Sequence, residues 1–326
     1  MATKHPGKRK KVAIFSGGPS PEHEVSLKSG KNVLKHLDPE KYEGFEFVVS
    51  KTGEWPMEDE MLRAQADLAF IAMHGPYGED GTVQHLLEIM PLPHTGSSAA
   101  ASALGMNKFI SLRHLADHGL TVPRTLLFHR LGWQTDRAAV LQKIQWYLEK
   151  PWVVKPNRGG SSIGVRIAKT PDELFHALEN GFAETSDVIV QPFIAGREYT
   201  CAVLDSGLPG AAFALPPTEI LPKTAGGFFD YEAKYTPGAS LEITPARAPQ
   251  SYITAFQRTA LFAHNALGCR GFSRTDMILG RDRKLYVLEV NTIPGLTENS
   301  LLPKAAAAYG LPMSRVLDII IEAALR

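Results

Sequence analysis

Polar side chains alternate along two neighbouring segments near the C-terminus, both of which we predict to be β-strands. Successive side chains of a strand point to opposite faces, so Glu289 and Asn291 share one face of the second strand, and Arg274 and Asp276 share one face of the first. The intervening residues 280–283 predict a hairpin turn, which would place Asp276 roughly opposite Glu289. Like charges directly opposite each other are destabilising, so we expect a positive group between them.

These two carboxylates, together with the side-chain oxygen of Asn291, form a hard, all-oxygen ligand set. Such a set suits Mg²⁺ that bridges nucleotide phosphates. The alternative is a solvated polar strand face on which Asp276 simply pairs with Arg274.

A second segment with chemical potential is the Gly/Ser loop that follows Lys155. This lysine ends an apolar strand predicted at Trp152–Lys155, and the loop contains Gly159-Gly160-Ser161-Ser162. Backbone N–H groups in such a loop can point at phosphate oxygens while the lysine supplies positive charge. The segment is not a Walker A loop, because no Gly-Lys-Ser/Thr follows the glycines. A flexible hairpin turn is the alternative.

A third segment runs from a strand predicted at Val188–Val190 through Gln191-Pro192 to Gly196-Arg197-Glu198. A strand that enters a proline-containing connection is typical of an interdomain hinge. Its backbone groups could contact the edge of an adenine, and Glu198 could hold ribose hydroxyls. The alternative is an ordinary strand and turn.

The composition is that of an ordinary globular protein and excludes several classes of function. The chain has 326 residues, 44% of them hydrophobic and 21% charged, and a net charge of +1, so nothing favours nucleic acid or an acidic membrane surface. No apolar segment approaches the 18 residues of a membrane span, and Val12–Phe15 is too short for a signal-peptide core. The two cysteines provide neither a disulfide framework nor metal-site spacing, and we expect a cytoplasmic protein.

The elements that position these segments alternate between strands and helices in the first third of the chain. Val12–Phe15 predicts a strand that ends at Gly17-Gly18, and a helix follows with Ser20 as its N-cap and Pro21 at its first position. Further strands are predicted at Phe45–Val49 and Leu68–Met73. The last of these runs into His74-Gly75-Pro76, at the end of a strand where α/β sheets place their ligand loops.

The rest of the chain predicts two further units. Helices are expected at Phe109–His118, Asp136–Glu149, Pro171–Asn180 and Tyr252–Leu267, and strands at Trp152–Lys155, Gly164–Ile167, Val188–Val190, Glu198–Leu204, Phe272–Leu279 and Lys284–Val290. The stretch Pro216–Gly238 predicts a long loop, and its aromatic residues favour a lid over a disordered segment. We expect a substrate domain at residues 1–97 and two further subdomains at 98–192 and 193–326.

In order, spacing and identity these segments resemble the D-alanine–D-alanine ligases of the ATP-grasp superfamily. The matching segments are residues 17–26, 74–81, 153–164, 231–235, 274–276 and 289–295, which together span most of the chain. The resemblance implies an α/β, three-domain ATP-grasp fold with an N-terminal doubly wound, pre-ATP-grasp domain. It also implies a reaction in which ATP and two D-alanines give D-alanyl-D-alanine through an acyl phosphate, for peptidoglycan precursor synthesis.

The resemblance assigns a role to individual residues. ATP would be bound by Lys108, Lys155, Ser162, Gln191, Phe193, Ile194, Glu198 and Lys234. Two Mg²⁺ ions, or Mn²⁺ in their place, would be held by Asp276, Glu289 and Asn291. Catalytic roles fall on Glu22, Ser161, Tyr235, Arg274 and Gly295, and the D-alanines would contact Glu22, His74, Ser300 and Leu301. Glu22 would bind the ammonium of the first D-alanine from a helix N-terminus, whose dipole favours its ionised form.

Two positions depart from the family pattern, and a third matches it. Gln191 stands where an acidic residue is usual, although an amide can still accept a hydrogen bond from the adenine amino group. Phe229 stands where tyrosine is sometimes found. Tyr235 matches the dipeptide-forming members rather than the ester-forming relatives, so we expect an amine as the second substrate. The resemblance also implies a homodimer.

Two other functions fit part of the pattern. A different ATP-grasp ligase would keep the nucleotide and metal residues but give Glu22 and Ser300 other partners. A dinucleotide-binding module is suggested by the first predicted strand and helix, but no Gly-x-Gly-x-x-Gly follows Phe15. A pure binding protein also has no need of the paired carboxylates Asp276 and Glu289.

Overall fold

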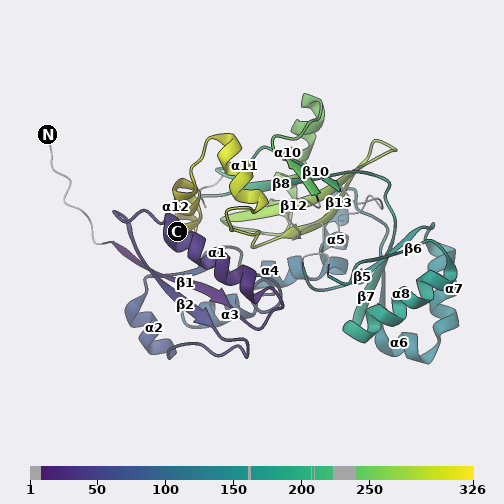
Figure 1. The fold of residues 1–326 in the computed structure, drawn as a ribbon, viewed down its shortest axis with the longest axis horizontal. Coiled ribbons are helices and arrows are strands. Elements are labelled where there is room, and N and C mark those ends of the chain that lie inside the picture. Colours follow the sequence, from purple (N-terminus) through teal and green to yellow (C-terminus); the bar gives the residue numbers. More distant parts are fainter. Residues whose placement is uncertain (1–8, 161–162, 207, 209, 223–239) are drawn as a thin grey trace.

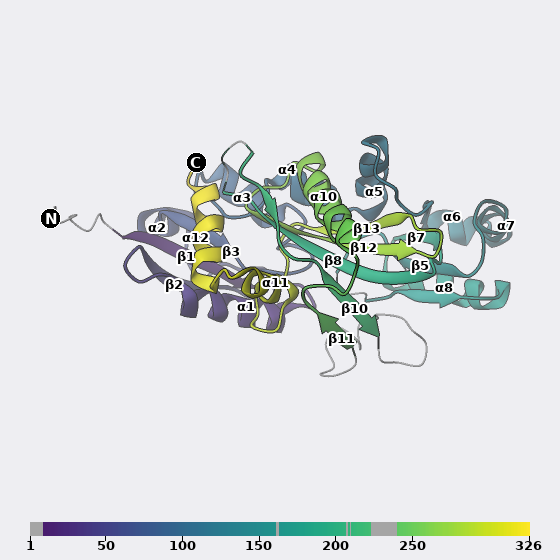
Figure 2. The ribbon, with the colours of Figure 1, turned by 90° about the horizontal axis from the view of Figure 1, so that it is seen from above.

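The computed structural model describes residues 9–160, 163–206, 208, 210–222 and 240–326, and these residues form three β-sheets with helices packed on them (Figure 1). Turned by 90°, the same chain is elongated, with the N-terminal sheet near one end and the sheet formed by residues 126–192 near the other (Figure 2). The α/β class and the ATP-grasp architecture expected from the sequence are confirmed. The domain boundaries stay a prediction.

The N-terminal unit is a parallel sheet with the strand order β2-β1-β3. Its elements are β1 (Lys10–Gly17), α1 (His23–His36), β2 (Tyr42–Val49), α2 (Asp59–Gln65), β3 (Leu68–Ile71) and α3 (Thr82–Ile89). Residues Val12–Phe15 of β1 are completely buried, as an apolar run in a sheet covered on both faces must be. Figure 1 shows α1 on one side of this sheet and α2 and α3 on the other.

The start of α1 corrects one prediction. Ser20 is not the N-cap, because the helix begins at His23 and Glu22 occupies the N-cap position. Ser20 closes a turn before the helix instead: its Oγ accepts a hydrogen bond from the Glu22 N–H at 3.0 Å, and its carbonyl accepts one from the His23 N–H at 3.1 Å. The turn sets Glu22 at the helix N-terminus, as expected from the sequence.

The central unit is an antiparallel sheet with the order β4-β7-β5-β6. Its elements are β4 (Leu126–His129), α6 (Arg130–Thr135), α7 (Arg137–Tyr147), β5 (Trp152–Pro156), β6 (Arg166–Ala168), α8 (Pro171–Glu184) and β7 (Asp187–Pro192). The two helices that precede these elements in the chain, α4 (Ala99–Met106) and α5 (Lys108–Asp117), pack instead on β13 (Leu285–Asn291) of the C-terminal sheet. Trp152 and Val154 of β5 pack into the core beneath the helices. The alternation of a strand therefore turns Val153 and Lys155 to the opposite face.

The C-terminal unit is a larger sheet with the order β11-β10-β8-β12-β13, to which β9 is added beside β8. Its elements are β8 (Gly196–Leu204), β9 (Phe213–Ala214), β10 (Thr218–Pro222), β11 (Ser240–Ile243), α10 (Gln250–Ala266), β12 (Phe272–Gly280), β13 (Leu285–Asn291), α11 (Leu301–Tyr309) and α12 (Met313–Ala324). Helix α10 covers one face, where Phe256 stacks on Tyr199 with ring centroids 4.3 Å apart. Helix α12 instead belongs to the core of the N-terminal sheet.

The expected loop at Pro216–Gly238 is wrong in its first part. Residues Thr218–Pro222 form β10, which pairs with β8 and β11. Prolines at both ends of this short run masked its strand character in the sequence. Residues 223–238 of the expected lid lie outside the described part of the chain.

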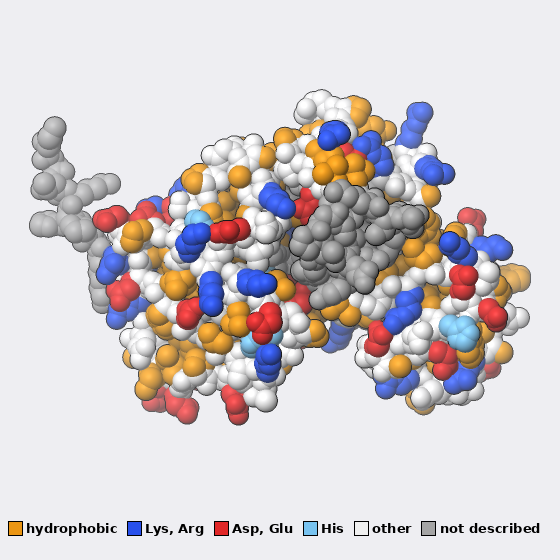
Figure 3. All heavy atoms as spheres, in the orientation of Figure 1, with side chains coloured by type: hydrophobic (Ala, Val, Ile, Leu, Met, Phe, Trp, Pro, Cys, Tyr) orange, Lys and Arg blue, Asp and Glu red, His pale blue; other side chains and the backbone are white. Residues whose placement is uncertain are grey.

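Two surface observations bear on the classes of partner. On the face shown in Figure 3, positive and negative side chains are interspersed. Among the described residues, no helix combines the length and the apolar character that crossing a bilayer requires.

Candidate active site

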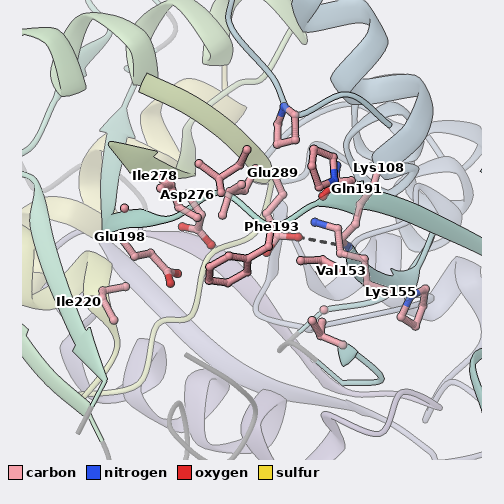
Figure 4. Close-up of a pocket in the computed structure, with 18 of the residues that line it drawn as sticks. Lys108, Val153, Lys155, Gln191, Phe193, Glu198, Ile220, Asp276, Ile278 and Glu289 are labelled. Atoms are coloured by element: carbon pink, nitrogen blue, oxygen red, sulfur yellow. Dashed lines mark ion pairs between the residues drawn. The ribbon is translucent and has the colours of Figure 1, made fainter. Parts of the chain in front are cut away.

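A cavity of about 190 Å³ lies between the central and the C-terminal sheets. Eight of the residues assigned to ATP or metal from the sequence line it: Lys108, Lys155, Gln191, Phe193, Ile194, Glu198, Asp276 and Glu289. In Figure 4, Lys155 of β5, Gln191 of β7 and Lys108 of α5 lie on one side, and Glu198 of β8 and Asp276 of β12 lie on the other. Residues separated by up to 181 positions in the sequence thus share one chamber.

The two carboxylates meet as the strand alternation predicted. In the antiparallel register of β12 and β13, Asp276 pairs with Glu289 and Arg274 pairs with Asn291. The ladder is irregular between Asp276 and Met277, directly beside the pair, and a bulge of this kind re-aims side chains next to functional sites.

Asp276 is held by several donors. Arg274 donates two hydrogen bonds to it, Nε to Oδ1 and Nη2 to Oδ2, each at 2.8 Å. The Thr200 hydroxyl donates to Oδ1 at 2.8 Å, and the Asn291 amide donates to Oδ2 at 3.3 Å. Asp276 is only 5% exposed, so the alternative of a solvated strand face is wrong for this residue, although its pairing with Arg274 is observed.

Each of the two carboxylates has a positive group beside it. Arg274 neutralises Asp276, and the Lys108 ammonium lies 3.2 Å from Glu289 Oε2 (Figure 4). Both members of the Lys108–Glu289 pair are largely buried, so solvent screens their attraction weakly.

This oxygen set fits Mg²⁺. Magnesium in nucleotide sites is held by one or two carboxylates plus substrate phosphates and water, rather than by a complete cage of protein ligands. Asp276 and Glu289 supply two carboxylates in register, and Asn291 adds an amide. No group of three or more His, Cys, Asp or Glu side chains suited to a metal occurs among the described residues, so a site that needed such a cage would not fit.

The two lysines assigned to the ATP phosphates are connected by a residue that the sequence reasoning left without a role. Asn157 is 1% exposed, and its Oδ1 accepts a hydrogen bond from the Phe109 N–H at 2.9 Å. Its backbone carbonyl accepts another from the Lys108 N–H at 3.0 Å. These bonds fasten the first turn of α5, which carries Lys108, to the end of β5, which carries Lys155. The signal for Asn157 in the sequence was only its place directly after Lys155-Pro156.

The segment expected to contact adenine lines the cavity wall. Gln191 is 3% exposed and Phe193 follows it two residues later. The Phe193 N–H donates to the Pro151 carbonyl at 2.7 Å, so its carbonyl is the backbone group left for a ligand. Glu198 lines the opposite wall and pairs in register with Ile278 of β12 and Ile220 of β10 (Figure 4).

Glu22, one of the residues assigned to D-alanine, lies beside the cavity. Glu22 borders both the His74 loop and the Lys155 loop, because a Cβ on Gly75 would lie 2.7 Å and one on Gly160 would lie 3.1 Å from Glu22 Oε2. Gly160 also lines the cavity, so the Glu22 carboxylate stands at its edge.

His74 connects the N-terminal loop to the segment after β13. Its Nε2 lies 2.8 Å from Ser29 Oγ, and its Nδ1 lies 3.3 Å from Glu79 Oε1 and 3.2 Å from the Ile293 carbonyl oxygen. Burial by itself lowers the pKa of His74, but the hydrogen bond and charge of Glu79 and the charge of Glu22 raise it above its ordinary value. Burial raises the pKa of the Glu79 carboxyl.

Three further residues assigned from the resemblance lie near the start of α11: Gly295, Ser300 and Leu301. Ser300 precedes the helix, and its Oγ accepts a hydrogen bond from the Thr297 N–H at 3.1 Å. A Cβ on Gly295 would lie 2.7 Å from the same Oγ, so Gly295 and Ser300 are in close contact. Leu301 is the first helical residue, where backbone N–H groups have no partner within the helix and suit a carboxylate.

The structure does not test four of the assigned residues. Ser161, Ser162, Lys234 and Tyr235 lie outside the described part of the chain, as does Phe229.

Known protein families match nearly the whole chain. Residues 11–65 and 56–97 match the family described as "D-ala D-ala ligase N-terminus", and residues 114–322 match "D-ala D-ala ligase C-terminus". The D-alanine–D-alanine ligase of Syntrophotalea carbinolica is 41% identical over 97% of this chain and 96% of its own.

Solved structures give the same picture. The VanG D-Ala:D-Ser ligase of Enterococcus faecalis is similar with a TM-score of 0.84 at 32% identity, covering 96% of this chain and 99% of that one. The D-alanine–D-alanine ligase of Bacillus anthracis complexed with ATP has a TM-score of 0.76 at 32% identity and covers 97% of each chain.

Proposed function

Because the chain belongs to the D-alanine–D-alanine ligase family, we propose that the chamber between its sheets activates one D-alanine with ATP and joins it to a second. The chain is an ATP-dependent D-alanine–D-alanine ligase that acts in peptidoglycan synthesis. The assignment of roles to its residues is our proposal.

At the nucleotide end, Lys108 and Lys155 bind the phosphates of ATP. Both are about 9% exposed and both line the cavity, so their charge acts in a poorly screened environment. Gln191 and the backbone of Phe193 and Ile194 contact the adenine, and Glu198 on the opposite wall holds the ribose hydroxyls.

At the metal end, Asp276, Glu289 and Asn291 hold two Mg²⁺ ions, with Mn²⁺ as a substitute. The bound ions supply charge neutralisation for the phosphate oxygens. Before binding, Arg274 and Lys108 neutralise these two carboxylates, which explains how a buried like-charge pair is tolerated.

At the substrate end, Glu22 binds the ammonium group of the first D-alanine, with His74 close to it. Arg274 and the Gly295 backbone stabilise charge that develops on the reacting carboxyl group. The Ser300 hydroxyl and the Leu301 N–H hold the carboxylate of the second D-alanine at the N-terminus of α11.

The reaction has two steps. A carboxylate oxygen of the first D-alanine attacks the γ-phosphorus of ATP. The bond between the γ-phosphorus and the bridging oxygen breaks, ADP is the leaving group, and the D-alanine becomes an acyl phosphate. The amino group of the second D-alanine then attacks the acyl carbon, loses its proton, and displaces inorganic phosphate. Holding both substrates in line accounts for most of the acceleration in such a reaction.

Four further roles rest on the resemblance alone. We propose that Ser161, Tyr235 and Glu22 form a hydrogen-bond network that closes a lid, and that Lys234 and Ser162 then contact the phosphates. Closure would exclude water, which otherwise hydrolyses the acyl phosphate.

The observation that carries the proposal is the shared cavity of Lys108, Lys155, Gln191, Asp276 and Glu289, with Glu22 at its edge. The test is ADP release by the purified protein with ATP and Mg²⁺, with the product identified by mass. D-Alanine should give D-alanyl-D-alanine. L-Alanine should give no ADP above background. ADP release with L-alanine, or none with D-alanine, would refute the substrate assignment.

A competition assay defines the second substrate. D-Alanine is mixed with D-serine in one reaction and with D-lactate in another. Mass spectrometry then identifies the products that contain D-alanine alone and those that also contain the second compound. We expect the D-alanine dipeptide to dominate and no ester with D-lactate.

We further propose that the enzyme is a cytoplasmic homodimer. Both cysteines, Cys201 and Cys269, are free and buried, as expected in a reducing compartment. Light scattering after size-exclusion chromatography should give twice the chain mass of 35.6 kDa. A single-chain mass at micromolar concentration would refute the dimer.

A further inference from the structure

The side chain of Gln191 lies between two other strands at the wall of the cavity. On one side, Gln191 pairs in register with Val153 of β5. On the other side, β7 pairs with β4 so that Val190 is opposite Leu126, and Thr125 precedes Leu126 directly. Gln191 is 3% exposed and lines the cavity together with Val153 and Pro123 (Figure 4).

A primary amide can face a ligand in two ways, as a donor through Nε2 or as an acceptor through Oε1. The two orientations occupy the same space, and only the surrounding hydrogen bonds distinguish them. A carboxylate at this position, as is usual in the family, would not have this ambiguity, because both of its oxygens accept. Gln191 therefore needs a neighbour that selects one orientation.

Thr125 makes that selection through a directed chain of hydrogen bonds. The Thr125 hydroxyl donates to the Pro123 carbonyl at an Oγ1–O distance of 2.8 Å, and a carbonyl can only accept. This bond uses the only hydrogen of the hydroxyl, so Thr125 can meet Gln191 only as an acceptor. Gln191 satisfies it by donating from Nε2 to Thr125 Oγ1 at 2.8 Å.

With Nε2 turned toward Thr125, the opposite end of the amide is the acceptor Oε1, and this is the atom that the fixed orientation offers to a ligand. The 6-amino group of adenine donates a hydrogen bond and matches this atom. The 6-oxo group of hypoxanthine or guanine accepts and would place two acceptors against each other in a buried site. A site built around one hydrogen bond rejects an analogue that leaves its buried group unpaired.

We propose that Thr125 is a positioning residue for nucleotide specificity: by fixing the Gln191 amide, it makes the cavity select 6-amino over 6-oxo purine triphosphates. The inference rests on the proposed function, in which the purine of ATP occupies this wall. Thr125 is not among the residues that the resemblance assigns to ATP. Its role would fix which end of the Gln191 amide faces the purine.

The test measures the dissociation constants of ATP and of inosine triphosphate, whose base has a 6-oxo group in place of the 6-amino group and a hydrogen on N1. Titrations are performed calorimetrically with Mg²⁺ and without D-alanine, so the result does not depend on dipeptide formation. The variants are Thr125→Val, which keeps the shape but removes the acceptor, Thr125→Ser, which keeps the hydroxyl, Gln191→Glu, and the double variant Thr125→Val/Gln191→Glu.

The wild-type protein should prefer ATP by a factor on the order of 10 to 100, the effect of one mismatched hydrogen bond to a buried group. Thr125→Val should reduce this preference by roughly tenfold, because the released amide can turn Nε2 toward the 6-oxo group. Thr125→Ser should keep the preference. Gln191→Glu should keep it as well, and adding Thr125→Val to that variant should change nothing further, because a carboxylate has no orientation to fix.

Three results would overturn the inference. One is an unchanged preference in Thr125→Val, and another is an equal weakening of both nucleotides, which is the mark of a merely structural role. The third is a loss of ATP preference on Thr125→Val that is equally large in the protein with Gln191 and in the Gln191→Glu variant. The proposed function has its own readout: a protein that discriminates the two nucleotides but makes no dipeptide would refute the ligase assignment and leave Thr125 in its role. A protein that binds neither nucleotide would overturn both.

Discussion

Replacing Asn157 by leucine should loosen the two lysines of the phosphate site from each other. Leucine keeps the branched shape of asparagine, with bulkier methyl groups in place of the amide oxygen and nitrogen, but it cannot accept the hydrogen bond from the Phe109 N–H, which is 2.9 Å long. The site is 1% exposed, so water does not replace the lost acceptor. A buried donor left unsatisfied costs about 1–3 kcal/mol. The backbone bond from the Lys108 N–H to the Asn157 carbonyl, at 3.0 Å, does not depend on the side chain and should persist.

The expected loss of stability follows from the hydrogen bond of the Phe109 N–H, which the variant cannot make. A loss of about 2 kcal/mol lowers the midpoint of thermal unfolding by roughly 4–8 °C in a cooperative unit of 150–250 residues. Because α5 begins at Lys108, its first turn is then held to Asn157 by one hydrogen bond instead of two, and the Lys108 ammonium should keep its position 3.2 Å from Glu289 less firmly. The Michaelis constant for ATP should therefore rise by about tenfold, the effect of weakening one charged contact.

Calorimetry and steady-state kinetics with Asn157→Leu and Asn157→Asp measure the two effects separately. Aspartate keeps an acceptor for the Phe109 N–H, so Asn157→Asp should unfold close to the wild-type temperature. Its added negative charge near Lys155 should still weaken ATP binding. The reasoning would be refuted if Asn157→Leu unfolded at the wild-type temperature. It would also be refuted if that variant lost stability while its Michaelis constant for ATP stayed unchanged.

Three further predictions concern the metal pair, the Glu22 contact and the His74 network. Glu289→Gln should raise the Mg²⁺ concentration for half-maximal activity and lower turnover by about 100-fold, with the fold intact by circular dichroism, because an amide lacks the charge that the metal role needs. The exposed control Glu60→Gln should match wild type, and a fully active Glu289→Gln would contradict the metal assignment. Gly160→Ala should raise the Michaelis constant for D-alanine more than that for ATP, because its Cβ would lie 3.1 Å from Glu22 Oε2, whereas Gly132→Ala in open space should have no effect; equal kinetics for the two variants would show that the contact does not matter. The pKa of His74 is raised in the folded protein, so its stabilising contribution is present below the unfolded-state pKa near 6.5 and is lost as pH rises through the higher folded-state pKa. The urea concentration at the midpoint of unfolding should therefore fall above pH 6.5 more steeply for wild type than for His74→Gln. Parallel profiles of the two proteins would exclude this role.

Local sequence rules predicted the parts of the site that lie within one hairpin or one strand end. Strand alternation placed Asp276 opposite Glu289, and this pairing is observed. The like charges also predicted a positive group between them, and the structure shows a positive partner for each carboxylate. The place of Lys155 at the end of an apolar strand was also predicted, because a short run of apolar residues indicates a buried strand. The helix after β1 was foreseen, but its start was misplaced at Ser20, since a serine that closes a turn looks the same as one that caps a helix.

Other features depended on contacts that no local pattern records. Asn157 fastens α5 to β5 across 48 residues, and Thr125 orients Gln191 across 66. Helix α12 is strongly apolar, but only the folded chain shows that it completes the core of the N-terminal sheet.

The sequence by itself therefore determined which residue types face the same way along each element, because backbone geometry imposes the period of strands and helices. The tertiary structure decided which faces pack against each other, and therefore which donor forms a hydrogen bond with each acceptor. The orientation of Gln191 is the sharpest case. Its residue type allows either a donor or an acceptor at the cavity wall, and a threonine on a neighbouring chain segment selects the acceptor by directing a single hydroxyl hydrogen elsewhere.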